Sequence, residues 1–175
     1  MDARRPRRPV STEAVSVEIS NRQRKLRVAA SWLERVARAA LAAERIEAAE
    51  ISLLVVGDRQ IARLHGDWLD DPSPTDVITF GLSEPGAAVL CGDIVVSAET
   101  AARVARQISA ERPGWTARHE LAYYVVHGIL HLTGYDDRTP ADRRSMRARE
   151  RAVMKAAGLP DRKSTRLNSS HLVIS

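Results

Sequence analysis

The chain of 175 residues contains a single cysteine, Cys91, and this scarcity excludes an internal disulfide framework. One thiol suits the reducing cytoplasm, so we expect a cytoplasmic protein with no disulfide partner. No apolar run approaches the roughly 20 residues that a membrane-spanning helix needs. The arginines near the N-terminus are not followed by a hydrophobic segment, so no secretory signal is expected. The apolar share of 44% is nevertheless sufficient for the core of one domain.

Both ends of the chain differ in character from its middle. Residues 1–14 are rich in arginine and are expected to form a disordered basic arm, and residues 15–160 are expected to form the domain. The segment Asp161–Ser175 is polar, has no periodicity and resembles the translation of a common sequencing-library adapter, so it is predicted to be a non-native tail. Without its three basic residues and one acidic residue, the net charge falls from +5 to +3.

The order of the predicted elements favours an α+β fold. Alternating or continuous apolar runs predict strands at Val15–Ile19, Ile51–Val56, Thr75–Leu82 and Val89–Ser97. Apolar residues at helical spacing predict helices over Arg22–Ala43, Asp58–Trp68, Ser97–Ala110, Thr116–Thr133 and Pro140–Ala157, with Asp58 and Ser97 as N-caps. The chain has no internal repeat and no regular alternation of strand and helix. We therefore expect a single domain with a small mixed sheet packed with helices, in which the last two strands can pair as a hairpin.

The most informative motif lies inside the fourth predicted helix. His127 and His131 are four residues apart and therefore share one face of that helix. Gly134 is expected to end the helix, so that Asp137 or Asp136 can return toward the imidazoles. Two nitrogen donors, one carboxylate and an open position are typical of catalytic zinc sites. The alternative is that both histidines bond to backbone carbonyls or to nearby acidic residues.

The motif lacks the glutamate of the metalloprotease pattern H-E-x-x-H, because position 128 is glycine. A peptidase is therefore the weaker interpretation, and a metal-dependent hydrolase of another kind is favoured. Gly128 leaves room for a substrate or for another element close to the helix. Glu120, two turns before His127, could orient a histidine, although an exposed or helix-stabilising glutamate is the simpler interpretation.

Three blocks of this sequence resemble the YbeY family of bacterial endoribonucleases, which bind zinc. The blocks are His127–Asp137, which resembles the family signature H-G-x-L-H-L-x-G-Y-D-x, Pro74–Phe80 and Cys91–Ser97. They occur in the right order, and the resemblance extends from about Ile51 to Gly158. It implies a zincin-like metal helix and one Zn²⁺ per chain, held by His127, His131 and Asp137, with the two histidines as catalytic residues.

The resemblance also implies a function. It predicts a single-strand-specific endoribonuclease that acts in 16S rRNA 3′-end maturation and in ribosome biogenesis and quality control, with the small ribosomal subunit and its rRNA as partners. Thr75, Asp76 and Asp93 are expected to line or brace the cleft, and each has a purely structural alternative. Arg138, Arg143, Arg144 and Arg147 could contact phosphates, since Arg143 and Arg147 share a helix face, although a solvated helix face is the alternative.

Two positions depart from the family pattern. The family motif usually ends in a third histidine, where this chain has Asp137; the added negative charge would make a bound zinc a weaker Lewis acid. The family commonly carries an arginine a few residues before the block Pro74–Phe80, and this chain has Leu69 at that position. Alternative functions are therefore a zinc-binding ribosome-associated protein with little catalytic activity, or a metal-dependent hydrolase of another substrate. A site of two histidines and an aspartate also accepts Ni²⁺, Fe²⁺ or Mn²⁺.

Overall fold

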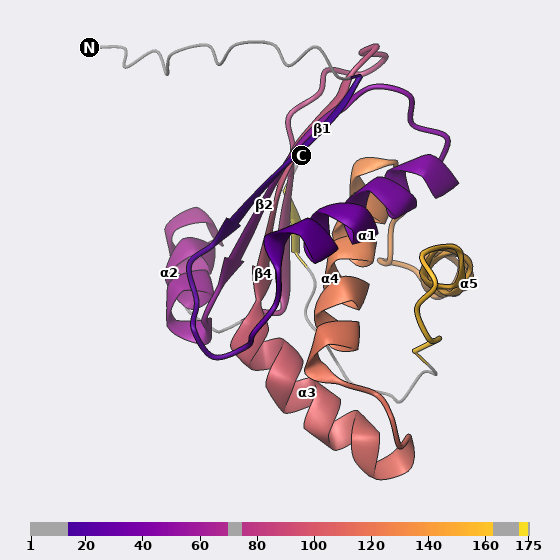
Figure 1. Cartoon of the computed structure of the whole chain (residues 1–175). Helices are drawn as coiled ribbons and strands as arrows, with labels where there is room; N and C mark the ends of the chain where they lie inside the picture. Colours follow the sequence, from indigo (N-terminus) through magenta and orange to yellow (C-terminus); the bar gives the residue numbers. More distant parts are fainter. Residues whose placement is uncertain (1–13, 70–74, 163–171, 175) are drawn as a thin grey trace.

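The computed structural model describes residues 14–69, 75–162 and 172–174, and its strands form one mixed sheet (Figure 1). The strand order is β1-β2-β4-β3-β5, from β1 (Val15–Asn21), β2 (Ala49–Val56), β3 (Val77–Gly81), β4 (Leu90–Ser97) and β5 (Leu172–Ile174). β1, β2 and β4 run parallel to one another, whereas β3 runs antiparallel to β4. The predicted hairpin between the strands now labelled β3 and β4 is confirmed.

The described residues form five helices, of which four lie on the two faces of the sheet and one packs outside them. They are α1 (Ala30–Ala43), α2 (Asp58–Leu69), α3 (Ala98–Glu111), α4 (Ala117–Leu132) and α5 (Pro140–Ala156). Figure 1 shows α2 on one face and α1, α3 and α4 on the other, with α5 outside α4. The predicted α+β class and single small mixed sheet are confirmed. Among the described residues, no helix combines the length and apolar character that crossing a membrane requires.

The helix α4 is the centre of the core on its face of the sheet, because it packs on β3 and β4 and is contacted by α1, α3 and α5. Every residue from Glu120 to His131 is buried. Gly128 explains how close the helix comes to the sheet: a Cβ at this position would lie 2.9 Å from Ile94 Cγ2 and 3.1 Å from Thr79 Oγ1. The space predicted beside Gly128 is therefore taken by another element, namely strands β3 and β4.

Two sequence predictions need correction. The first helix begins at Ala30 instead of Arg22, because the Gln23 side chain bonds both the amide and the carbonyl of Leu26 and closes an irregular loop. Asp58 is the first residue of α2 and does not cap it; its carboxylate instead accepts hydrogen bonds from β4 and α3. Ser97 caps α3 as predicted, since its Oγ accepts from the amide of Thr100.

The two ends of the chain are described to different extents. The predicted disordered arm falls almost entirely outside the described residues, as does the turn at residues 70–74. Part of the C-terminal segment is placed in the fold: Leu172–Ile174 pairs with β3, and Arg162 bonds to the buried Glu120. That this segment is non-native stays a prediction, because a foreign segment can also pair with an open sheet edge.

Candidate metal centre

The two histidines of the motif meet on the buried face of α4, as their spacing predicts. His127 is 1% exposed and His131 is 8% exposed. Their Nε2 atoms face each other at 2.9 Å, and the ring planes lie nearly perpendicular, with centroids 4.4 Å apart. Both rings therefore direct the same nitrogen toward one point.

Asp137 joins them because of the way in which α4 ends. Gly134 adopts a positive φ of 103°, its amide donates to the carbonyl of His131, and the amide of Tyr135 donates to that of Leu130. This is the Schellman pattern, which reverses the chain immediately after the helix. It brings Asp137 Oδ2 to 3.8 Å from Nε2 of His127 and 3.9 Å from Nε2 of His131.

These three side chains fit a metal ion. Their ligand atoms all lie within 4.8 Å of one another, and together they form the candidate metal-binding group found among the described residues. A point equidistant from the three atoms lies about 2.1 Å from each, and zinc is bound by nitrogen and oxygen at about 2.0–2.2 Å. The donor set is the one that catalytic zinc, and other divalent transition metals, accept.

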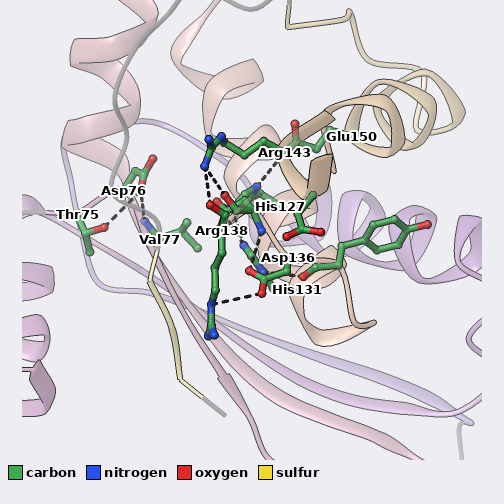
Figure 2. A network of polar contacts seen from close by, with 12 residues as sticks. Thr75, Asp76, Val77, His127, His131, Asp136, Arg138, Arg143 and Glu150 are labelled. Atoms are coloured by element: carbon green, nitrogen blue, oxygen red, sulfur yellow. Dashed lines mark hydrogen bonds and ion pairs between the residues drawn. The ribbon is translucent and has the colours of Figure 1, made fainter. Parts of the chain in front are cut away.

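The other ring nitrogen of each histidine is bonded to the protein (Figure 2). His127 Nδ1 lies 2.6 Å from Glu150 Oε1, and His131 Nδ1 lies 2.9 Å from the carbonyl oxygen of Tyr135. A carboxylate and a carbonyl only accept, so each Nδ1 carries the proton and each Nε2 presents its lone pair to the centre. The acidic and carbonyl partners that were an alternative to metal binding are thus part of the same arrangement.

Glu150 is a further residue of the candidate centre, and the sequence analysis does not predict it. It lies on α5, its side chain is 4% exposed, and its second oxygen accepts from Tyr123 Oη at 2.7 Å. Burial and the nearby Glu150 carboxylate raise the pKa of Tyr123 well above its ordinary value, so this hydroxyl remains a donor. A signal existed, because Glu150 falls on the same face of α5 as the buried Met146 and Val153.

Glu120 does not orient His127, because Glu150 bonds the nitrogen that it would have to hold. Glu120 is fully buried and accepts from Trp115 Nε1 at 2.8 Å. Its carboxylate also pairs with Arg162 at 2.8 Å. Neither of these partners bonds to His127 or His131.

Asp136, the alternative candidate for the third ligand, makes its hydrogen bonds within the turn. Its Oδ1 accepts from the amide of Asp137 at 2.7 Å, and its Oδ2 lies 3.3 Å from Arg138 Nε. Asp136 therefore shapes the turn that presents Asp137, and the geometry favours Asp137 as the ligand.

The residues predicted to line the cleft lie apart from the histidines. Thr75 and Asp76 are each 3% exposed; Asp76 Oδ1 accepts from the amide of Val77, which braces the start of β3 (Figure 2). Asp93 follows Gly92 and precedes Ile94, both of which face α4. Since side chains alternate along a strand, Asp93 points to the opposite face and cannot support the metal ligands.

The predicted arginines divide into two groups. Arg138, Arg144 and Arg147 are exposed, as phosphate contact requires, and Arg138 lies next to the candidate ligand Asp137. Arg143 instead donates from Nη1 to the carbonyls of Asp137 and Arg138. Leu69 is the last residue of α2, beside Trp68, which is 62% exposed and packs on Phe80 with ring centroids 5.3 Å apart.

Comparison with known proteins relates the sequence of this chain to one family. A family model described as Endoribonuclease YbeY matches residues 17–158. A protein of that description from Anaeromyxobacter sp. strain Fw109-5 is 46% identical over 146 residues, which cover 83% of this chain and 73% of the relative. Another, from Syntrophotalea carbinolica, is 41% identical over 143 residues, which cover 77% of this chain and 90% of the relative. The solution structure of TM1509 from Thermotoga maritima superposes with a TM-score of 0.59 at 24% identity, over 81% of this chain and 89% of that one. This structural likeness supports the fold alone.

Proposed function

The chain belongs to the endoribonuclease YbeY family, and on this premise we propose that it is a metal-dependent endoribonuclease that cuts single-stranded RNA. We propose further that it acts in the maturation of the 3′ end of 16S rRNA and in ribosome biogenesis and quality control, with the small-subunit rRNA as its partner. The observation that carries the proposal is the convergence of His127 Nε2, His131 Nε2 and Asp137 Oδ2 within 4.8 Å, inside the matched region.

The protein's own residues support hydrolysis at this centre. His127, His131 and Asp137 would hold one Zn²⁺, which, when bound, supplies Lewis acidity toward a phosphodiester and activates water. Glu150 and the carbonyl of Tyr135 keep both imidazoles in the tautomer that presents Nε2. Asp137 is 24% exposed, so the centre is accessible on that side, and the exposed Arg138 can attract a phosphate there.

The proposal is tested with an RNA that carries the 3′ end of 16S rRNA, either single-stranded or paired with a complementary strand. We expect the zinc-loaded protein to cut the single strand, a chelator to abolish cleavage, and added zinc to restore it. His131→Ala should lose more than the ten- to hundredfold that outer partners of a metal site contribute. His119→Gln, which removes a histidine from the same helix away from the centre, should retain activity.

Zinc content tests the ligands independently of RNA. Wild type should hold about one zinc per chain, and Asp137→Ala should hold almost none. Cleavage that is indifferent to chelation and to His131→Ala would contradict metal catalysis. Zinc binding without RNA cleavage would favour the alternative of a ribosome-associated binding protein.

A further inference from the structure

The loop between α4 and α5 carries the third ligand, and donors hold its backbone on both sides of that ligand. Before Asp137, the carbonyl of Tyr135 accepts from His131 Nδ1, so α4 itself fixes this end. After it, Arg143 Nη1 donates to the carbonyl of Asp137 at 3.1 Å and to that of Arg138 at 2.8 Å. The second end of the loop is therefore fixed from α5 (Figure 2).

Arg143 is well placed for this contact because the start of α5 is rigid. Thr139 caps the helix in a reciprocal capping box with Asp142, and Pro140 occupies the first turn. The amide of Arg143 donates to the carbonyl of Thr139 at 2.9 Å. The guanidinium therefore extends from a fixed backbone, and the two hydrogens on Nη1 suffice for two carbonyls.

The identity of the third ligand makes this support important. A carboxylate oxygen lies closer to its own Cα than Nε2 of a histidine does, so an aspartate reaches the centre only if the backbone is placed closely. Asp137 is also the most exposed of the three ligands, with 24% of its side chain accessible against 2% and 3% for the histidines. The position of its carboxylate thus depends on the loop more than on packing.

We propose that Arg143 is a positioning residue for the metal: it holds the Asp137 loop so that the carboxylate meets the two imidazoles, and it does not serve as a phosphate contact. This inference rests on the metal centre of the proposed function but not on RNA cleavage. Arg147 is the natural comparison, because it lies one turn further along the same face of α5, is exposed, and has no hydrogen bond or ion pair within the described part of the chain.

The direction in which zinc affinity changes when Arg143 is replaced distinguishes a role in positioning Asp137 from an effect of the arginine's charge. Removing a cation near a divalent metal weakens electrostatic repulsion, so charge alone predicts equal or tighter metal binding. Loss of a support that orients a ligand predicts weaker binding, typically ten- to hundredfold. Because Arg143 is exposed, we expect the low end of that range.

The experiment measures the zinc dissociation constant by competition with a chromophoric chelator, in the full chain without RNA. Arg143→Ala should raise the constant about tenfold, and Arg143→Lys should raise it less, because an ammonium can still donate to a carbonyl. Arg147→Ala should leave it unchanged or lower it. The melting temperature of the metal-free protein should be similar in wild type and Arg143→Lys, which separates loop positioning from loss of fold.

Wild-type zinc affinity in both Arg143 variants would overturn the inference, and so would a tenfold loss in Arg147→Ala. RNA affinity of the zinc-saturated Arg143→Ala protein should equal that of wild type; a large loss there, with zinc affinity intact, would make Arg143 a phosphate contact instead. If the wild-type protein binds zinc but never cuts RNA, the proposed function fails while this inference stands. If Asp137→Ala binds zinc as tightly as wild type, the inference is overturned whatever the cleavage result.

Discussion

Each imidazole of the candidate metal centre has one nitrogen that bonds to another protein group, and the two partners come from different parts of the chain. His131 bonds to a carbonyl only four residues away, so its orientation is a local consequence of how α4 ends. His127 bonds to Glu150, 23 residues away on another helix. That carboxylate is held in turn by Tyr123, and the neighbouring Arg149 ties α5 to Glu44, the residue that follows α1. The orientation of His127 therefore depends on how α5 docks.

Replacing Glu150 should weaken metal binding without touching a ligand. In Glu150→Gln the negative charge behind His127 is lost, which makes Nε2 a poorer donor, so the zinc dissociation constant should rise ten- to hundredfold. Tyr123→Phe leaves the carboxylate in place and should have a smaller effect. Chelator competition measures both variants. Equal affinity in Glu150→Gln and wild type would mean that the carboxylate does not tune the histidine.

At this scale the sequence predicts the ligands but not what holds them. His127 and His131 follow from spacing along one helix, and its stop signal predicts a third ligand at Asp137 or Asp136, of which the family resemblance favours Asp137. Glu120 was chosen because it shares a face with His127, yet seven residues of helix separate the two by about 10 Å. The true partner comes from a different element, and single-sequence spacing carries no information on which helices pack together.

Among the elements, α2 and α3 are joined by a partly buried polar junction at Asp58. The carboxylate of Asp58 accepts from Ser97 Oγ at 2.5 Å, from Thr100 Oγ1 at 2.6 Å and from Arg103 Nη1 at 2.6 Å. Burial alone would raise the pKa of this carboxyl, but the hydrogen bonds outweigh it and hold the pKa below its ordinary value. The ionised carboxylate therefore stabilises the fold.

This junction predicts a pH-dependent stability. Because the pKa of Asp58 is lowered in the folded state, its contribution is complete above the ordinary value near 4 and is lost as the pH falls through the folded value. Asp58→Asn should lower the free energy of unfolding by about 2 kcal/mol at pH 7, and the difference from wild type should shrink below about pH 4. Urea unfolding of the metal-free protein measures this, with the exposed Asp67→Asn as control. A difference that is constant with pH would contradict the ionised junction.

The bounds of an element can be predicted where its apolar residues follow one periodicity. The prediction is wrong where polar side chains form hydrogen bonds with residues of other segments. The helix α4 was found because its apolar run ends at a glycine with positive φ. The predicted start of α1 is too early because Val28 packs on the core from an irregular segment and so continues the helical spacing of the apolar residues. Asp58 was read as a cap because the sequence does not show that α3 will supply its hydrogen-bond donors.

For the whole molecule, the fold class followed from the order of the elements, but the role of the C-terminal segment did not. The resemblance of Asp161–Ser175 to a translated adapter and its lack of periodicity predict a non-native tail. The structure nevertheless packs Arg162 against Glu120 and over the ring of Tyr123, with Cζ 4.5 Å from the ring centroid. A fully buried carboxylate requires a cation or a set of donors wherever it occurs. The compensation of Glu120 thus comes from outside the residues matched by the family model, which end at 158.

Removing that cation should cost stability but leave the metal centre intact. In Arg162→Ala, Glu120 keeps its bond from Trp115 but loses its ion pair, and breaking one side of a buried pair costs about 3 kcal/mol. Glu120→Gln should recover most of this loss when combined with Arg162→Ala, because no charge is then left buried. Urea unfolding of the four proteins of this double-mutant cycle measures the coupling. Zinc affinity should change less in these variants than in Glu150→Gln, since neither Glu120 nor Arg162 bonds to His127, His131 or Asp137. Additive effects of the two substitutions on the free energy of unfolding would contradict a stabilising ion pair. The C-terminal segment would then contribute nothing to the stability of the predicted domain, residues 15–160.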